Sequence, residues 1–260
     1  MQSNGPHDHW SRRDFLHAAV VLSLGAPECS LKGAANSVGP ARLNAWPRAP
    51  TIAAVPGLSP LGLSSDGRDG VLLVPAGYMP GRPTPLVLAL HGAGGRPSGP
   101  VSLLGSYAEA HGFVLLVPAS RQATWDGILD AFGPDVAFID RALSHAFDRI
   151  TVDQARIIVE GFSDGASYAL SLGRANGDLF RRIVAFSPGF VPESRSGDVG
   201  RAAVFVSHGR QDRILPIDAA SRRIVPALQA EGYPVTYVEF EGGHTVSAAI
   251  LKQGVEWMLG

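Results

Sequence analysis

A glycine-flanked serine is the feature that most constrains this chain. Residues 161–165 read Gly-Phe-Ser-Asp-Gly and follow the apolar, β-branched run 157–159. The pattern Gly-x-Ser-x-Gly is typical of a buried strand that ends in a turn so sharp that only glycine fits on either side of the serine, with a helix starting directly after it. We therefore expect Ser163 to be strained and exposed, with its hydroxyl available as a nucleophile.

The pattern alone is not specific, because a chain with 31 glycines produces it by chance. A tight turn with a hydrogen-bonding serine is the alternative. An acid and a base that follow in the chain order Ser, Asp, His favour catalysis. Asp212 follows the apolar strand 203–206 in a polar glycine turn, and His244 follows the alternating strand 235–240 and two glycines.

These three residue types supply a known chemistry. A serine hydroxyl is a weak nucleophile at neutral pH, so an imidazole must take its proton as it attacks. A buried carboxylate then fixes the imidazole tautomer and stabilises the imidazolium. The sequence thus predicts a catalytic triad of Ser163, Asp212 and His244.

A glycine-rich loop is available to hold the negative oxygen that develops on the acyl carbon. Residues 91–95 read His-Gly-Ala-Gly-Gly and follow the apolar strand 86–90. We expect the backbone N–H groups of Ala93 and Asp164 to form the oxyanion hole, each contributing roughly 3 kcal/mol. The alternatives are an ordinary strand-to-helix turn and a phosphate cradle, although neither a Gly-x-Gly-x-x-Gly motif nor a P-loop lysine is present.

Taken together, these motifs resemble the α/β-hydrolase superfamily, and within it the small lidless serine esterases of the phospholipase/carboxylesterase and the polyhydroxybutyrate-depolymerase or feruloyl-esterase-like groups. The matching pieces are 91–95, 161–165, the His-Gly-Arg-Gln-Asp run 208–212 with Leu-Pro at 215–216, and the Gly-Gly-His run 242–244. The resemblance implies that these pieces act as oxyanion loop, nucleophile, acid and base. Asp164 departs from the small or amide residue that many relatives carry there, which leaves the acyl preference open.

Apolar runs alternate with helical patterns through the rest of the chain. Strands are expected over residues 71–74, 86–90, 113–117, 157–159, 183–186, 204–206 and 235–240, and helices over 101–110, 135–147, 166–174, 218–230 and 246–259. Strand then helix, repeated, indicates an α/β fold with a mostly parallel central sheet and helices on both faces. The resemblance makes this the α/β-hydrolase fold.

The substrate side of the site is less constrained by sequence. The segment 188–201 is short and polar, which leaves no room for a large helical lid. Loops at the carboxyl ends of strands line the site in open α/β sheets, so Trp125, Asp126 and Phe190 are candidate pocket walls, with core packing as the alternative for each. Asp135 and Asp140 are interpreted as solvated acids near a helix start.

The N-terminal stretch has the composition of a targeting signal. Arg12 and Arg13 precede the apolar run 18–26, which is too short to span a bilayer and resembles a twin-arginine export leader. We expect a signal peptide over 1–35, a flexible linker over 36–57 and a catalytic domain over 58–260. The twin-arginine export machinery would then carry the precursor to the periplasm or the medium.

Other classes of protein have little support. The net charge of −1 and the lack of a basic stripe with interleaved aromatics argue against nucleic-acid binding. Cys29 is the only cysteine, and its neighbours Pro27 and Glu28 do not suit a lipid anchor, so no stable membrane anchor is expected. Without paired cysteines or histidines at i, i+4, we expect neither a metal nor a cofactor.

The sequence therefore predicts an exported serine carboxylesterase that hydrolyses short-chain or accessible polymeric esters through an acyl-enzyme. A serine peptidase or an acyltransferase would use the same parts, because fold does not fix the leaving group or the acyl acceptor. A non-catalytic ligand-binding homologue is the alternative from another class.

Overall fold

The protein is described by a computed structural model that covers residues 39–260. The expected signal peptide over 1–35 lies outside the described residues. The described residues belong to one compact unit.

One mostly parallel sheet organises this unit. Within the described residues it has eight strands in the order β1-β2-β4-β3-β5-β6-β7-β8. β1 pairs with β2 and β2 with β4 in antiparallel fashion, and all the other pairs are parallel. The strands are β1 (Gly57–Pro60), β2 (Gly70–Val74), β3 (Thr84–Leu90), β4 (Val114–Pro118), β5 (Val152–Phe162), β6 (Arg182–Phe186), β7 (Ala203–Gly209) and β8 (Val235–Phe240).

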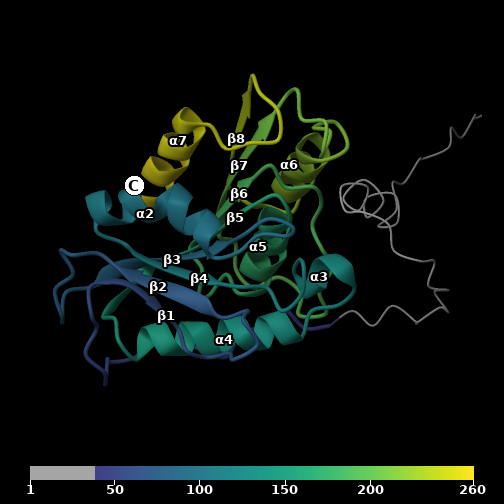
Figure 1. The fold of residues 1–260 in the computed structure, drawn as a ribbon. Coiled ribbons are helices and arrows are strands. Elements are labelled where there is room, and N and C mark those ends of the chain that lie inside the picture. Colours follow the sequence, from purple (N-terminus) through teal and green to yellow (C-terminus); the bar gives the residue numbers. More distant parts are fainter. Residues whose placement is uncertain (1–38) are drawn as a thin grey trace, which may run out of the picture. The chain divides into compact units, whose positions relative to one another are not determined.

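Helices cover both faces of the sheet, as expected (Figure 1). Those of the described residues are α2 (Ser98–His111), α3 (Asp126–Leu129), α4 (Pro134–Phe147), α5 (Asp164–Ala175), α6 (Ser221–Ala230) and α7 (Ala248–Leu259). Side chains of α2 and α7 pack in one hydrophobic cluster on one face. Side chains of α4, α5 and α6 pack in a second cluster on the other face. The predicted α/β architecture is confirmed.

The central strands are apolar on both faces because helices cover both. Every residue of β3 and of β4 is buried. Such strands appear in sequence as continuous apolar runs rather than as alternating patterns, which is why both were predicted close to their observed bounds. Their carboxyl ends deliver the oxyanion loop and the loop that leads to α3.

Three elements differ from the expectation. β1 has only four residues, including a glycine and a proline, and its alternating partial burial gives little apolar signal. β5 begins at Val152 rather than at 157. Its first residues pair with β3 only through Thr84, and after a register shift the regular pairing starts at Ile157, where the strand was predicted to begin. α3 is a single short turn with no periodicity to detect.

The expected linker over 36–57 requires correction. Ala41, Leu43 and Ala45 are buried in the hydrophobic core. Asn176 anchors the segment, since its side-chain Oδ1 accepts the N–H of Leu43 at 2.8 Å and its Nδ2 donates to the carbonyl of Ala41 at 2.8 Å. Small apolar residues at alternating positions insert between polar ones, so this Ala- and Pro-rich composition packs against the domain instead of hanging free.

Asp140 also differs from the expectation of a solvated helix acid. Its Oδ1 accepts the N–H groups of Asn44 at 2.6 Å and of Ala45 at 2.7 Å. A carboxylate that accepts two backbone N–H groups holds the N-terminal segment against α4.

Candidate active site

The turn between β5 and α5 explains why both glycines of the 161–165 motif are needed. A Cβ on Gly165 would lie 2.1 Å from the carbonyl oxygen of Leu90, at the end of β3. A Cβ on Gly161 would lie 2.3 Å from the carbonyl group of Gly165. Only glycine permits these approaches, so α5 begins directly against the carboxyl end of the sheet.

Ser163 occupies the strained position of this turn. Its φ of 58° and ψ of −120° lie outside the regions that non-glycine residues usually adopt. The expectation that it is exposed requires correction, because only 9% of the residue is accessible. The ring of His244 and the loop after β3 lie against Ser163. A Cβ added to Gly92 in that loop would lie 3.4 Å from the Cβ of Ser163.

The structure brings Ser163, His244 and Asp212 together in one hydrogen-bonded line. The Nε2 atom of His244 lies 2.8 Å from the Oγ of Ser163, and its Nδ1 lies 2.6 Å from Oδ2 of Asp212. Because a carboxylate only accepts, Nδ1 carries the hydrogen and Nε2 is free to accept the serine proton. This is the tautomer that a general base requires.

Several donors converge on Asp212, which is 5% exposed. Its Oδ1 accepts the N–H groups of Ile214 at 2.9 Å and of Leu215 at 2.8 Å. Burial alone would raise the pKa of this carboxyl, but the hydrogen bonds from His208, His244 and the Leu215 N–H outweigh burial and hold the pKa well below its usual range. Asp212 therefore stays ionised beside His244.

His208 is a partner of this carboxylate that the sequence analysis missed. The Nε2 of His208 lies 3.2 Å from Oδ2 of Asp212 and 2.8 Å from the carbonyl of Leu215. Both partners are acceptors, so Nε2 carries a hydrogen and donates to them. The signal available in the sequence was the spacing of four residues between His208 and Asp212.

Glycines also bring the acid and base loops together. A Cβ on Gly209 would lie 2.4 Å from the carbonyl oxygens of Gly242 and Gly243. The N–H of Gln211 donates to the carbonyl of Gly242 at 2.9 Å. The turn after β7 and the loop after β8 thus touch backbone to backbone, which places His244 over Asp212.

Two backbone N–H groups point to an oxyanion site. Asp164 is the first residue of α5, so its N–H has no acceptor within the helix. In the loop after β3, Gly94 donates to the carbonyl of Ala123 at 2.7 Å and Gly95 donates to that of Gly92 at 3.0 Å. No acceptor for the N–H of Ala93 exists within residues 39–260.

The side chain of Asp164 faces away from the solvent. Its Oδ2 accepts the hydroxyl of Thr124 at 2.7 Å, and the residue is 6% exposed. Burial raises the pKa of this carboxyl, while the bond from Thr124 lowers it. The carboxyl holds the loop after β4 against the nucleophile turn, and it does not cap its own helix.

Trp125 does not line a pocket, contrary to expectation. Its side chain is completely buried, and its indole N–H donates to the carbonyl of His91 at 2.8 Å. The rings of Trp125 and His91 pack with centroids 4.8 Å apart. The aromatic residue supports the first residue of the oxyanion loop from behind.

His91 is held by both ring nitrogens. The N–H of Ser120 donates to Nε2 at 3.0 Å, so Nδ1 carries the hydrogen and donates to the carbonyl of Gly92 at 2.8 Å. Burial lowers the pKa of this imidazole, which keeps it neutral. His91 is thus a structural member of the oxyanion loop.

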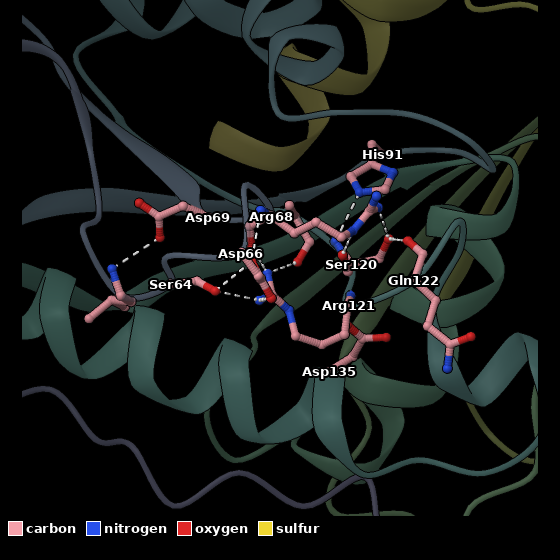
Figure 2. A network of polar contacts seen from close by, with 11 residues as sticks. Ser64, Asp66, Arg68, Asp69, His91, Ser120, Arg121, Gln122 and Asp135 are labelled. Atoms are coloured by element: carbon pink, nitrogen blue, oxygen red, sulfur yellow. Dashed lines mark hydrogen bonds and ion pairs between the residues drawn. The ribbon is translucent and has the colours of Figure 1, made fainter.

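A polar network extends from His91 to the hairpin before β2 (Figure 2). The guanidinium of Arg68 donates to the backbone carbonyl and the hydroxyl of Ser120. Arg121 donates to the carbonyl of Arg68 and to the hydroxyl of Ser64. The oxyanion loop is therefore braced by segments far away in sequence.

Asp126 and Asp135 interlock instead of facing substrate or solvent. Oδ2 of Asp126 accepts the N–H of Asp135 at 2.7 Å, and Oδ2 of Asp135 accepts the N–H of Asp126 at 2.7 Å. Burial, then the neighbouring Asp126 charge, raises the pKa of Asp135 to about 6. Burial also raises the pKa of Asp126. The pair closes the loop that contains α3, so the expectations of a pocket wall at Asp126 and of a solvated Asp135 were wrong.

The hollow lined by Phe190 is separate from the hollow lined by His244. Phe190 is half-buried and lines a depression of about 320 Å³ with Arg174, Ala219 and Arg223. His244 lines a cavity of about 430 Å³ beside the oxyanion loop, together with Ala93 and Phe162. The two sets of lining residues share no member.

Other kinds of site find no support in the described part of the chain. Residues 39–260 contain no group of three or more His, Cys, Asp or Glu side chains arranged to hold a metal ion. Within the same range, no helix has the length and apolarity needed to cross a bilayer. The segment between β6 and β7 contains no helix, so no lid covers the site within these residues.

Comparison with known proteins shows which esterases this chain is similar to. Residues 113–256 match the family model described as phospholipase/carboxylesterase. Feruloyl esterase C of Emericella nidulans is 31% identical over 213 residues, which cover 69% of this chain and 77% of that protein. A probable feruloyl esterase C of Aspergillus oryzae is 32% identical over 180 residues, covering 66% and 64% of the two chains.

Solved esterase structures share the fold. The crystal structure of esterase PE8 superposes with a TM-score of 0.60 at 20% identity, covering 73% of this chain and 97% of that one. A phospholipase/carboxylesterase from Dyadobacter fermentans gives a TM-score of 0.58 at 18% identity, covering 81% and 99%. The fold is the α/β-hydrolase fold, and the chain belongs to the phospholipase/carboxylesterase family, whose members are hydrolases that act on ester bonds.

Proposed function

We propose that this protein is an exported serine carboxylesterase that cleaves short-chain or accessible polymeric esters through an acyl-enzyme. The hydrogen-bonded line Ser163–His244–Asp212 carries the proposal, with distances of 2.8 Å and 2.6 Å. Ser163 is the nucleophile, His244 the general base and Asp212 the acid that orients it. The absence of a lid between β6 and β7 supports access by short or polymeric esters.

The reaction follows from these positions. As the Oγ of Ser163 attacks the ester carbonyl, its proton moves to Nε2 of His244, and Asp212 stabilises the imidazolium that forms. The N–H groups of Ala93 and Asp164 hold the oxygen that becomes negative. The imidazolium then gives its proton to the departing alcohol. Water repeats these steps on the acyl-enzyme and releases the acid.

Hydroxycinnamoyl esters are a second candidate substrate class. Their support is the identity of 31% to a feruloyl esterase C over 77% of that protein's length. The cavity of about 430 Å³ beside His244 lies within the range of about 300–1,000 Å³ that is common for small-molecule sites.

The deciding experiment is hydrolysis of p-nitrophenyl esters of graded acyl length by protein without the leader, with Ser163→Ala as control. Turnover of p-nitrophenyl acetate and p-nitrophenyl butyrate that falls as the acyl chain lengthens, and that is lost in Ser163→Ala, supports the proposal. An initial burst of p-nitrophenol equal to the enzyme concentration would report the acyl-enzyme. A folded protein that hydrolyses none of these esters, nor methyl ferulate, would refute it.

Export rests on sequence alone, on Arg12 and Arg13 before the apolar run 18–26. A double change of Arg12→Lys and Arg13→Lys in a bacterial host should retain the precursor in the cytoplasm. The unchanged precursor should be found in the periplasm or the medium. Equal distribution of the two precursors would refute twin-arginine export.

A further inference from the structure

A glutamate lies within the apolar face of the sheet beside the candidate nucleophile. Glu160 belongs to β5 and is 2% exposed. In the sheet register its neighbours are Ala89 on β3 and Val184 on β6, both of which belong to the α2 and α7 cluster. Side chains alternate along a strand, so Ile158 and Phe162 share its face. An apolar residue would satisfy packing at this position.

One oxygen of the Glu160 carboxyl lacks a hydrogen-bond partner in the described part of the chain. Its Oε2 atom is buried and has no hydrogen-bond partner within residues 39–260. Burial raises the pKa of this carboxyl to about 8, so it is neutral and protonated at neutral pH. Buried polar groups in native proteins are nearly always hydrogen-bonded, and an exception calls for an explanation.

Glu160 is among the residues that line the cavity of about 430 Å³ beside the oxyanion loop. We call it the Glu160 cavity. Ala93 and His244 border it, as does Phe162, the residue before the nucleophile. Most of the remaining wall is apolar and comes from Leu90, Pro100, Leu103 and Val246. A group bound there would be part of the same ester whose carbonyl lies at Ser163.

We propose that the Glu160 cavity receives an arm of the ester substrate that carries a hydroxyl group, and that Glu160 determines specificity by hydrogen-bonding this hydroxyl. The inference rests on the proposed esterase function and adds the chemistry of the substrate. A protonated carboxyl offers one donor and further acceptor capacity, which matches a hydroxyl. Arg96, an exposed cation that also lines the cavity, disfavours a positively charged arm.

The size of the effect follows from leaving a buried polar group unpaired. A site that hydrogen-bonds a substrate hydroxyl rejects the analogue that lacks it far more strongly than an apolar pocket rejects an extra group. We expect the enzyme to hydrolyse methyl para-hydroxycinnamate with a kcat/KM at least about tenfold above that for methyl cinnamate.

Two substitutions at Glu160 test the origin of this preference. Glu160→Leu should abolish the preference and leave or raise kcat/KM for methyl cinnamate, because the cavity becomes wholly apolar. Glu160→Gln keeps a donor and an acceptor, so it should retain most of the preference. Glu256→Gln, on an exposed side chain of α7, is the matched control and should change neither rate. An equal loss of both rates in Glu160→Leu, or an unchanged preference, would overturn the inference.

Binding to Ser163→Ala separates this inference from the proposed function. Calorimetric titration of Ser163→Ala with the two methyl esters should show tighter binding of the hydroxylated ester, and adding Glu160→Leu should remove the difference. If the enzyme hydrolyses no ester but this difference persists, the proposed reaction fails and the cavity inference stands. If the enzyme hydrolyses p-nitrophenyl esters and the two methyl esters bind equally, the cavity inference alone fails.

Discussion

The Nε2 atom of His208 lies 3.2 Å from the same carboxylate oxygen of Asp212 that faces Nδ1 of His244 at 2.6 Å. Asp212 is therefore shared between two histidines. Only His244 reaches Ser163, at 2.8 Å. His208 is completely buried, and its other nitrogen lies 2.6 Å from the hydroxyl of Ser221. Its position ties the acid loop to the start of α6.

Replacing His208 should affect stability and catalysis together. His208→Leu leaves the Leu215 carbonyl and one acceptor position of the Asp212 carboxylate without the donor that His208 supplies, so we expect a loss of roughly 1–3 kcal/mol in the free energy of unfolding. We also expect kcat/KM to fall, because Asp212 is held less firmly. Urea unfolding and p-nitrophenyl acetate hydrolysis measure the two effects. His111→Leu, at the exposed end of α2, is the control. If His208→Leu changes neither the free energy of unfolding nor kcat/KM, the assignment of His208 as a partner of Asp212 is wrong.

Gly165→Ala should disrupt the nucleophile turn. The new Cβ would lie 2.1 Å from the carbonyl oxygen of Leu90, and neither backbone atom moves without shifting α5 or β3. We expect severe loss of activity and a large drop in thermal stability. Gly105→Ala within α2 meets only side chains at 3.6 Å or more, so it should stabilise the helix by up to about 1 kcal/mol. Equal behaviour of the two variants in thermal unfolding would contradict this account.

The segment 39–57 belongs to the folded domain in this structure, which a core truncation tests. Leu43 is 3% exposed, so Leu43→Ala should lower the free energy of unfolding by about 2–5 kcal/mol. Val55 is 73% exposed, and Val55→Ala should have almost no effect. Urea denaturation of both variants provides the comparison. If Leu43→Ala leaves the free energy of unfolding unchanged, the segment is a linker rather than part of the folded domain.

The sequence predicted the parts of the fold and site that depend on local pattern. Central strands are continuous apolar runs, and Ser163, Asp212 and His244 each follow a strand in a recognisable turn. The roles of Trp125, Asp126 and Asp135 were not predictable, because they depend on partners that only the fold brings close. Trp125 meets His91, which is 34 residues away in the chain. Composition likewise hid the packing of Leu43, since the alternation of apolar residues over 41–45 is short and lies in an Ala- and Pro-rich segment.

Glu160 should also make stability depend on pH. Its folded pKa of about 8 lies above its ordinary value of 4.5, so between these values the folded state binds a proton that the unfolded state releases. Stability then falls as pH rises through this window, and the loss is complete above the folded pKa. Glu160→Gln should remove the part of the decline that Glu160 causes and leave the part that Asp135, with its pKa of about 6, contributes at lower pH, whereas Glu256→Gln should keep the whole decline. Urea unfolding at several pH values between about 5 and 9 measures it. If the curves of unfolding free energy against pH are parallel for the unsubstituted protein, Glu160→Gln and Glu256→Gln, the pKa of Glu160 is the same in the folded and unfolded states.

Replacing Trp125 tests whether this side chain supports the oxyanion loop or contacts the substrate. Trp125→Phe keeps an aromatic ring in the core but removes the indole N–H that donates to the carbonyl of His91 at 2.8 Å. If Trp125 only holds the oxyanion loop, Trp125→Phe loosens the position of Ala93. We then expect kcat to fall by about ten- to a hundredfold, less than the roughly hundred- to thousandfold loss from removing one oxyanion donor. KM should keep its dependence on acyl length, because a completely buried side chain touches no substrate. The check is a series of p-nitrophenyl esters with both constants measured for each. A shift of the preferred acyl length with unchanged kcat would instead show that Trp125 is a pocket wall and that other residues hold the oxyanion loop in place.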